Sequence, residues 1–326
     1  MATLKDVAER AGVTVTTVSR MLNNRTQVSK KTRDKINQAF KELDYQPNEL
    51  ARSLSKKTSS FIGLIISSAQ NYFYCKVIDY VERYAAQYGY KLLLCVSNHE
   101  PEKEREYFNM LKAHKVAGVI LGSHTQNLDL NEHQNFESPI ITVDRMISTS
   151  IPAVGSDNYH GGVLAAKHLL AKGCRKPAFF TVSPVEGFMA NMRYNGFSEI
   201  WQQNGITPTY YEAPQERMIS MRYEDEIEAF FKKNPDVDCV FASNDVAAVE
   251  FLRYCLRHGM SVPEQIKVIG YDDIELAGFY TPSLTTIRQP IEDICRFSVE
   301  SIVQYREKSI PVNTIFPVQL IEREST

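Results

Sequence analysis

The sequence predicts a small all-α head followed by a much larger α/β core, and three observations support this division. Residues 3–22 contain two short amphipathic helical patterns that meet at Gly12. From residue 59 onwards, apolar runs of strand length alternate with longer helical patterns, as in parallel sheets covered by helices. Residues 1–58 carry a net charge of +6, and since the whole chain carries −2, the remaining residues carry −8.

The first helix of the head is predicted to begin at Thr3. Thr3 and Asp6 have the spacing of a capping box, in which each residue satisfies a backbone N–H of the other. The apolar face of this helix consists of Leu4, Val7, Ala8 and Ala11. Gly12 ends the helix, because glycine readily adopts the left-handed conformation that follows a helix.

A second helix is predicted to begin after a cap at Thr14. Its inward face consists of Val18, Met21 and Leu22, and its outward face of Val15, Thr16, Ser19 and Arg20. These outward side chains suit base edges in a DNA major groove, as in a helix-turn-helix. Many helical bundles also contain two short helices around a glycine without binding nucleic acid. The concentration of positive charge in residues 1–58 favours contact with phosphates.

A third helix is predicted from Ser29 to about Leu43. It would cover the first two helices with Thr32, Ile36, Ala39, Phe40 and Leu43. Lys30 and Lys31 lie in its first turn, where the helix dipole disfavours positive charge. We therefore expect these lysines to face phosphate, the alternative being an ordinary solvated charge cluster.

A short linker follows the head. Pro47 ends the head, and Asn48 can cap a segment of one or two helical turns over residues 49–55. A helix of this length is marginal in water unless it packs against something.

The motifs DVAERAGV, TVSRMLN, VSKKTRDKI and YQPNELARSL occur in this order in residues 6–54, and together they resemble the LacI/GalR family of regulators. The resemblance continues through the whole chain. It implies a transcriptional repressor that binds a pseudo-palindromic operator as a homodimer. It also implies a helix-turn-helix domain over residues 1–46, a hinge helix and linker over 47–58, and an effector-binding and dimerisation domain over 59–326.

The resemblance assigns DNA contacts to residues of the head and hinge. In the hinge, Leu54 would wedge between base pairs in the minor groove, and Leu50 and Ala51 would contact the partner hinge helix. The alternative is that Leu50 and Leu54 merely cap a linker. The complete implied set is Thr3, Thr14, Val15, Thr16, Thr17, Ser19, Arg20, Asn23, Lys30, Thr32, Tyr45, Asn48, Ala51 and Leu54.

In the core, apolar runs and helical periodicity predict alternating strands and helices. Strands are expected at 61–66, 91–96, 116–121, 140–143, 153–155, 178–182, 239–242 and 267–270. Helices are expected at 74–88, 102–114, 160–172, 191–204, 222–233, 245–258 and 290–305. The resemblance implies two Rossmann-like subdomains, as in periplasmic binding proteins. They would comprise residues of about 59–158 with 287–314, and about 159–286 with 315–326.

Polar residues follow several predicted strands, where open parallel sheets bind their ligands. Asp144 and Arg145 follow one strand, Asn244 another and Asp272 a third. Carboxylates accept hydrogen bonds from adjacent hydroxyls and an arginine donates two parallel ones, so such residues suit a sugar. The alternative for Asp144 and Asn244 is that they cap the next helix.

The resemblance assigns effector binding to Arg193 and Asp272, with further contacts from Asp144 and Asn244. The segment that contains Tyr72 and Phe73 departs from the family pattern, because the family has Asn-Pro-Phe-Phe where this chain has Asn-Tyr-Phe-Tyr at 71–74. These rings would stack on a sugar ring or belong to the core. The expected effector is a sugar or sugar phosphate, with a purine as the alternative. Segments such as LGSHTQNL and VGSDNYHGG resemble sucrose-operon-type members of the family.

Other classes of protein are not supported. The six cysteines contain no CxxC and predict reduced, mostly buried thiols, and the seven histidines lack metal-ligand spacing. Nucleotide-binding and hydrolase motifs are missing, so we expect no cofactor, no metal and no enzyme activity. The sequence shows no signal peptide and no membrane span, which predicts a cytoplasmic protein. A sugar-binding module without a regulatory role is disfavoured by the intact head and hinge.

The resemblance also implies an allosteric mechanism, in which a sugar changes the angle between the subdomains and misaligns the paired hinge helices. Sugar would then relieve repression. The opposite sign, in which a small effector or a protein partner strengthens DNA binding, occurs in the family and stays open at this point.

Overall fold

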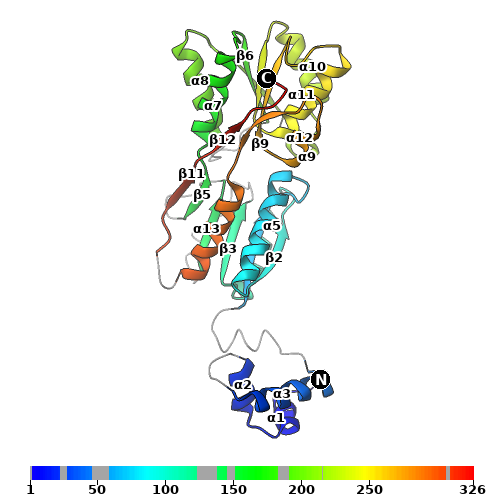
Figure 1. Cartoon of the computed structure of the whole chain (residues 1–326), viewed down its shortest axis with the longest axis vertical. Helices are drawn as coiled ribbons and strands as arrows, with labels where there is room; N and C mark the ends of the chain where they lie inside the picture. The colour runs from blue at the N-terminus through cyan, green and yellow to red at the C-terminus, as the bar shows by residue number, and fades with distance from the viewer. Residues whose placement is uncertain are drawn as a thin grey trace. The chain divides into compact units, whose positions relative to one another are not determined.

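The structure is a computed structural model that describes residues 2–22, 28–45, 59–122, 138–144, 151–182, 191–214, 216–305 and 309–326. The chain forms two compact units, Met1–Ser59 and Ser60–Thr326. The described residues of the first unit form only helices and their connections, and the second unit contains two parallel-type sheets covered by helices (Figure 1). The predicted combination of an all-α head and an α/β core is confirmed.

The head consists of α1 (Leu4–Ala11), α2 (Val15–Leu22) and α3 (Lys30–Glu42). The predicted capping box is present, since the Thr3 N–H donates to Asp6 at 2.7 Å and the Asp6 N–H donates to the Thr3 hydroxyl at 3.3 Å. Gly12 ends α1 with a φ of 64°. All three helices contribute to one small core, formed by Val7, Ala8, Ala11, Val18, Ile36 and Ala39.

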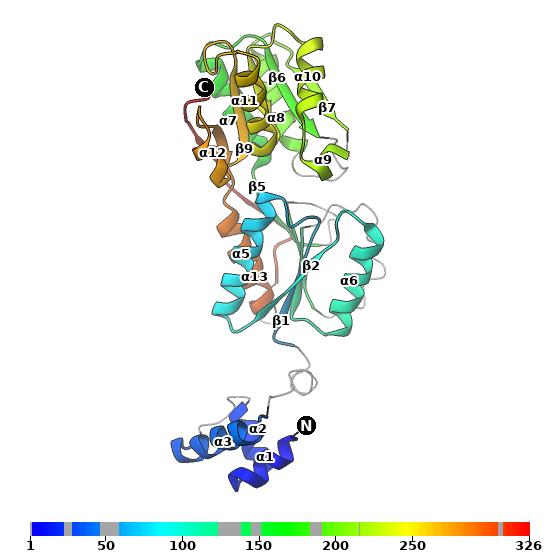
Figure 2. The same cartoon turned by 90° about the vertical axis from the view of Figure 1, so that its right-hand side faces the viewer.

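The first subdomain of the core is built on a six-stranded sheet with the order β11-β5-β4-β3-β1-β2. Its strands are β1 (Phe61–Ile66), β2 (Lys91–Val96), β3 (Gly118–Gly122), β4 (Ile140–Val143), β5 (Ala153–Ser156) and β11 (Asn313–Phe316). Helices α5 (Tyr72–Gln87) and α13 (Ile291–Gln304) cover one face, and α6 (Pro101–Ala113) covers the other (Figure 2).

The second subdomain is built on a six-stranded sheet with the order β12-β10-β9-β8-β6-β7. Its strands are β6 (Pro177–Val182), β7 (Thr209–Ala213), β8 (Cys239–Ala242), β9 (Lys267–Asp272), β10 (Thr285–Arg288) and β12 (Gln319–Ile321). Helices α7 (Asn158–Ala171) and α8 (Asn191–Gln203) cover one face. Helices α10 (Glu224–Lys233) and α11 (Asp245–Arg257) cover the other (Figure 1).

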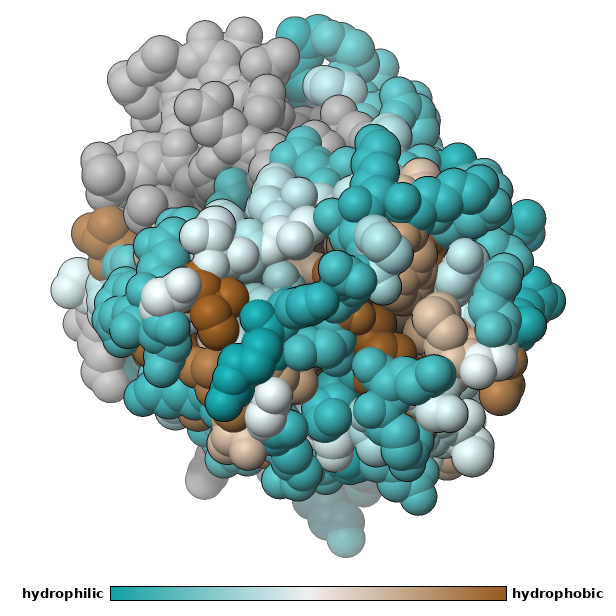
Figure 3. Space-filling view, turned by 90° about the horizontal axis from the view of Figure 1, so that it is seen from above, coloured by the Kyte–Doolittle hydropathy of each residue, from teal (hydrophilic) through white to brown (hydrophobic). Residues whose placement is uncertain are grey.

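The chain crosses between the two sheets more than once. It leaves the first sheet after β5, returns from β10 to α13 and β11, and leaves again to form β12. Consequently neither subdomain is a continuous segment. Seen from above, the second subdomain presents a mostly hydrophilic surface on which hydrophobic residues form small, separated patches (Figure 3).

Several elements were not predicted from the sequence: β7, β10, β11 and two five-residue helices, α9 (Glu216–Ser220) and α12 (Glu275–Phe279). The missed strands are short and lie towards a sheet edge or carry alternating exposed residues, as in the partly exposed Thr209–Ala213. Such strands lack the continuous apolar run that marks a buried strand. The strand expected at 116–121 is instead Gly118–Gly122, because a turn occupies the preceding residues.

The cysteines are free, and five of them are buried, so the prediction of mostly buried thiols is confirmed. Cys75 is the exposed one. Within the described residues, no helix has both the length and the apolar character needed to cross a bilayer.

Candidate ligand site and nucleic-acid interface

Helix α2 exposes the face that the sequence assigns to DNA bases. The Val15 side chain is 42% exposed although it is apolar, and Thr16 and Arg20 are exposed as well. Ser19 and Thr17 are partly buried. An apolar side chain held in water at the start of a helix is suited to contact a thymine methyl group.

The caps of α2 and α3 use several of the predicted contact residues. The Thr14 hydroxyl accepts from the Thr17 N–H at 3.2 Å and lies 2.9 Å from the Thr17 hydroxyl. At α3 the Thr32 N–H donates to the Ser29 hydroxyl at 3.3 Å. Both helix N-termini therefore have ordered hydroxyl groups, which can also donate to phosphate oxygens.

The remaining predicted DNA contacts divide into described and undescribed residues. Lys30 is exposed at the start of α3, and Tyr45 stacks on Phe40 with a ring-centroid distance of 5.4 Å. Thr3 caps α1. Asn23, Asn48, Ala51 and Leu54 lie outside the described residues.

In the core, Arg193 is the central polar residue, and its side chain is buried. The arginine lies in the first turn of α8, which packs tightly against α7. A Cβ added at Gly162 would lie 2.0 Å from the Arg193 carbonyl oxygen, so the glycine permits this close approach. The two helices thereby fix the position from which the Arg193 side chain extends.

The Arg193 guanidinium has partners from several elements. Its Nε donates to the Asn158 side-chain oxygen at 2.7 Å, and a terminal nitrogen donates to the Ser243 carbonyl at the end of β8. The guanidinium also lies over the Tyr271 ring, 3.6 Å from its centroid. Asp144, which belongs to the first subdomain, lies 3.9 Å from the other terminal nitrogen. Arg193 therefore connects the two subdomains.

Asp144 follows β4 with a φ of 57°, a left-handed conformation that directs its carboxylate into the interior. It is 6% exposed, and the Asn158 amide lies 3.5 Å from one of its oxygens. Burial raises the pKa of Asp144, although Arg193 and Asn158 oppose this effect.

Asp272 ends β9 and is also buried, with a φ of 117°. The Gln289 amide donates to its carboxylate at 2.6 Å, and the Gln289 oxygen accepts from the Ser156 hydroxyl at 2.6 Å. Ser156 belongs to the first sheet, so this chain of hydrogen bonds also joins the subdomains. Burial raises the pKa of Asp272 from 3.8 to about 7, with Arg193 and Gln289 acting in the opposite direction.

Asn244 lies apart from this group, because its side chain caps α11 by accepting from the Ala247 N–H at 2.8 Å. The neighbouring Asp245 is fully buried and binds the Thr286 hydroxyl and the Ile274 N–H. Burial raises the pKa of Asp245 well above its ordinary value. The structure thus brings Arg193, Asp144 and Asp272 together and gives Asn244 a capping contact.

The two aromatic residues at the start of α5 have different surroundings. Tyr72 is 39% exposed, whereas Phe73 is 6% exposed and packs in the core of the first subdomain. Arg145 lies outside the described residues. Four further residues of this group were not predicted from the sequence: Asn158, Tyr271, Ser156 and Gln289. Asn158 carried a signal, since it follows a predicted strand, but Gln289 follows β10, which was not predicted.

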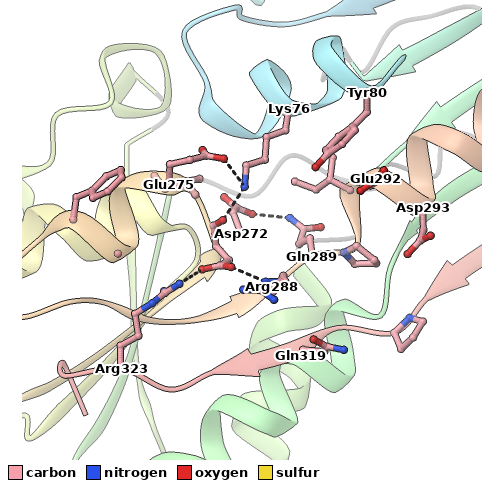
Figure 4. A pocket seen from close by; sticks show the side chains of 17 residues that line it. Lys76, Tyr80, Asp272, Glu275, Arg288, Gln289, Glu292, Asp293, Gln319 and Arg323 are labelled. Carbon is pink, nitrogen blue, oxygen red and sulfur yellow. Dashed lines mark hydrogen bonds and ion pairs between the residues drawn. The ribbon is translucent and has the colours of Figure 1, made fainter. Parts of the chain in front are cut away.

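A cavity of about 720 Å³ lies next to Asp272 at the junction of the two subdomains. Lys76 of α5 reaches across it, donating to the Asp273 carbonyl at 2.9 Å and pairing with Glu275 at 3.2 Å (Figure 4). Deeper in the second subdomain, Asp273 pairs with both Arg288 and Arg323 at 2.6 Å. Burial raises the pKa of Asp273, but the hydrogen bonds and charges of Arg323 and Arg288 together outweigh this effect and lower the pKa.

A helix-turn-helix head, joined to a core whose two sheets meet at buried polar side chains, defines a ligand-responsive DNA-binding regulator. Residues 3–48 match the model of bacterial regulatory proteins of the lacI family, and residues 166–326 match that of the periplasmic binding protein-like domain. The chain belongs to the LacI family, and it is a regulator rather than an enzyme.

Relatives of known function align with the full chain. The sucrose operon repressor of Streptococcus mutans is 37% identical over 100% of this chain and 99% of its own length. The ribose operon repressor of Halalkalibacterium halodurans is 37% identical over 100% of this chain and 97% of its own. A Lac repressor dimer bound to operator and the anti-inducer ONPF has a TM-score of 0.85 and 28% identity, covering 99% of this chain and 98% of the other.

Proposed function

We propose that this protein represses a sugar-utilisation operon in the cytoplasm. As a homodimer it binds a pseudo-palindromic operator, and a sugar that binds between the subdomains releases it. The observation that carries this proposal is the buried group formed by Arg193, Asp144 and Asp272, which come from both subdomains. A ligand that replaces these contacts must change the relative orientation of the two subdomains.

The chemistry of this group favours a polyhydroxylated ligand. Two carboxylates can accept hydrogen bonds from neighbouring hydroxyls, and the guanidinium can donate to hydroxyl or ring oxygens. Among the described residues, the side chains that contact Arg193 and Asp272 are neutral or acidic, which favours an uncharged sugar over a phosphorylated one. The sucrose operon repressors of Streptococcus mutans and Pediococcus pentosaceus support sucrose or one of its component sugars as the effector.

On DNA, we assign base recognition to the exposed face of α2, with Arg20 bidentate to a guanine and Val15 against a thymine methyl. Leu54 would enter the minor groove. Sugar binding would weaken operator affinity through a coupling free energy of about 1–3 kcal/mol, which corresponds to roughly 5–150-fold.

The deciding experiment measures binding of the full-length protein to DNA upstream of its own gene by fluorescence anisotropy at fixed salt. Sucrose, glucose, fructose, ribose, their phosphates and purines are then added one at a time. Release by an unphosphorylated sugar supports the proposal. Tight binding that is unaffected by sugars but strengthened by another small molecule would show a corepressor-type regulator instead.

A further inference from the structure

The second subdomain contains a pair of buried cysteines, far along the chain from one another, at the amino-terminal edge of its sheet. Cys174 follows α7, and Cys239 is the first residue of β8. The reactive atoms of Cys174, Cys239 and Asp238 all lie within 4.8 Å of one another. The two thiols are 3% and 0% exposed, and neither takes part in the ligand site described above.

Backbone contacts hold Cys174 beside Cys239. One Asp238 oxygen accepts from the Arg175 N–H at 2.6 Å, and the other accepts from the Lys176 N–H at 2.9 Å. The Asp238 N–H in turn donates to the Lys176 carbonyl at 3.1 Å. In the sheet, Cys239 pairs with Pro177. The turn that carries Cys174 is thus fastened to the start of β8 by three hydrogen bonds.

The two thiols have different chemical environments. A hydrogen bond from the Cys239 thiol, helped by Lys267 and Arg175, lowers the pKa of Cys174. Burial raises the pKa of Cys239. The thiolate is the nucleophile in sulfur chemistry. Cys174 is therefore the residue that reacts first, and Cys239 is the residue that attacks the oxidised Cys174 sulfur.

Small molecules can approach this end of the sheet. A shallow pocket of about 340 Å³ is lined by residues 175–177 and by Asp236 and Val237, the immediate neighbours of the cluster in sequence. Both oxygens of Asp238 already accept backbone N–H groups, and Arg175 and Lys267 add positive charge. These features favour sulfur oxidation over capture of a metal cation.

We propose that Cys174 and Cys239 form a reversible intramolecular disulfide when the protein is exposed to a peroxide. The Cys174 thiolate attacks one peroxide oxygen, an S–O bond forms as the O–O bond breaks, and the leaving hydroxide takes a proton to become water. The Cys239 sulfur then attacks the Cys174 sulfur, and the S–O bond breaks with release of a second water. Two thiols and one hydrogen peroxide thus give one disulfide and two waters, and a dithiol reductant reverses the change.

The bond would close a ring that contains β6, α8, β7 and α10, so Arg193 lies inside it. A cross-link between such distant residues restricts the unfolded chain and stabilises the folded one. We therefore expect oxidation to raise the midpoint temperature of unfolding of the core. In cytoplasmic proteins, disulfides are generally transient and responsive to redox conditions.

The test uses the full-length protein with Cys75→Ser, which removes the exposed thiol. After treatment with hydrogen peroxide, intact-mass spectrometry should show the loss of two hydrogens, and digestion under non-reducing conditions should yield one cross-linked pair containing Cys174 and Cys239. Dithiothreitol should reverse both results. The additional variants Cys174→Ser and Cys239→Ser should abolish the cross-link, whereas Cys255→Ser, at another buried cysteine, should retain it.

Four results would overturn the proposal. The first is that Cys174 forms sulfinic acid without a cross-link, and the second is that peroxide leaves both thiols unchanged. The third is that the cluster binds added Zn²⁺ with one-to-one stoichiometry and that the bound zinc protects it from oxidation. Operator binding and circular dichroism of each variant establish that it is folded. A cross-link that survives in Cys174→Ser would likewise contradict the assignment.

Discussion

Arg193 illustrates how one side chain serves both the second subdomain and the contact with the first. Its Asn158 and Ser243 partners fix the guanidinium plane, and its third edge faces Asp144. Lysine carries the same charge but lacks the planar donor arrangement that this geometry uses. The position therefore depends on arginine in particular.

We predict that Arg193→Lys raises the sugar concentration needed for half-release from operator DNA by about tenfold or more, since a hydrogen bond to a charged group contributes roughly 1.5–3 kcal/mol. Operator affinity without sugar should also change, because the substitution weakens the contact with Asp144 that joins the two subdomains. Anisotropy titrations measure both quantities. Arg253→Lys, on a more exposed helix position, is the matched control, and a normal sugar response of Arg193→Lys would exclude Arg193 from the site.

Asp272 gives a prediction about pH. Its pKa of about 7 lies above the ordinary value of 3.8, so between these values the folded protein holds a proton that the unfolded chain releases. The contribution of Asp272 to stability is therefore present at low pH and is lost as pH rises towards 7. The slope of this loss is at most about 1.4 kcal/mol per pH unit.

The variant Asp272→Asn should lack this pH dependence, because an amide resembles the protonated carboxyl. Its free energy of unfolding, relative to that of the original protein, should increase as pH rises from about 4 to about 7. Urea denaturation at a series of pH values measures this difference. A difference that is constant over the range would show that Asp272 is already ionised at low pH.

At the level of single elements, α2 illustrates what a helical pattern can and cannot predict. Its period correctly separated the buried Val18 from the exposed Val15, Thr16 and Arg20. The period does not reveal which bases these side chains read. The bases that are read depend on the operator DNA, and the packing of α2 within the protein does not specify them.

Arg20→Ala should relax the preference at one base pair in each half-site, costing about 1–3 kcal/mol on the preferred base and little on the others. Binding to a library of operators with every single-base substitution measures this preference. Lys30→Ala is the control, since loss of a phosphate contact should weaken all sequences similarly and reduce the salt dependence. Equal weakening by Arg20→Ala on every sequence would remove Arg20 from base recognition.

The elements of the core were predictable where their sequences are continuous apolar runs, as in Phe61–Ile66 and Cys239–Ala242. Thr285–Arg288 was missed because its buried threonines give it no such run. Its omission hid Gln289, whose hydrogen bond to Asp272 depends on the end of that strand. Motif resemblance predicted Arg193 and Asp272 as effector contacts, whereas the packing of Arg193 on Tyr271 required the three-dimensional structure.

For the core as a whole, the contacts of Lys76 stabilise the observed arrangement of the two subdomains. We predict that Lys76→Met lowers the free energy of unfolding by about 1–2 kcal/mol, since it removes a hydrogen bond as well as an ion pair. Glu275→Gln should cost less than about 1 kcal/mol, because Glu275 is largely exposed. Adding Glu275→Gln to Lys76→Met should have no further effect.

Denaturation of the four proteins in this cycle gives the coupling between the two side chains. Lys232→Met is the comparison, because Lys232 pairs with Glu228 inside a single helix. Only the Lys76 variants should also shift the sugar concentration that releases operator DNA. Identical sugar responses in all variants would show that the Lys76 contacts do not distinguish the two arrangements of the subdomains.

The repeated crossing of the chain between the sheets also has a consequence for biosynthesis. During translation the first subdomain lacks α13 and β11 until the C-terminal part of the chain has left the ribosome. Ile294, Val299 and Ile302 of α13 nevertheless belong to the core of this subdomain. The nascent chain must therefore expose the apolar face that α13 later covers while the second subdomain is synthesised. A translational stop before residue 291 would leave this face open to aggregation.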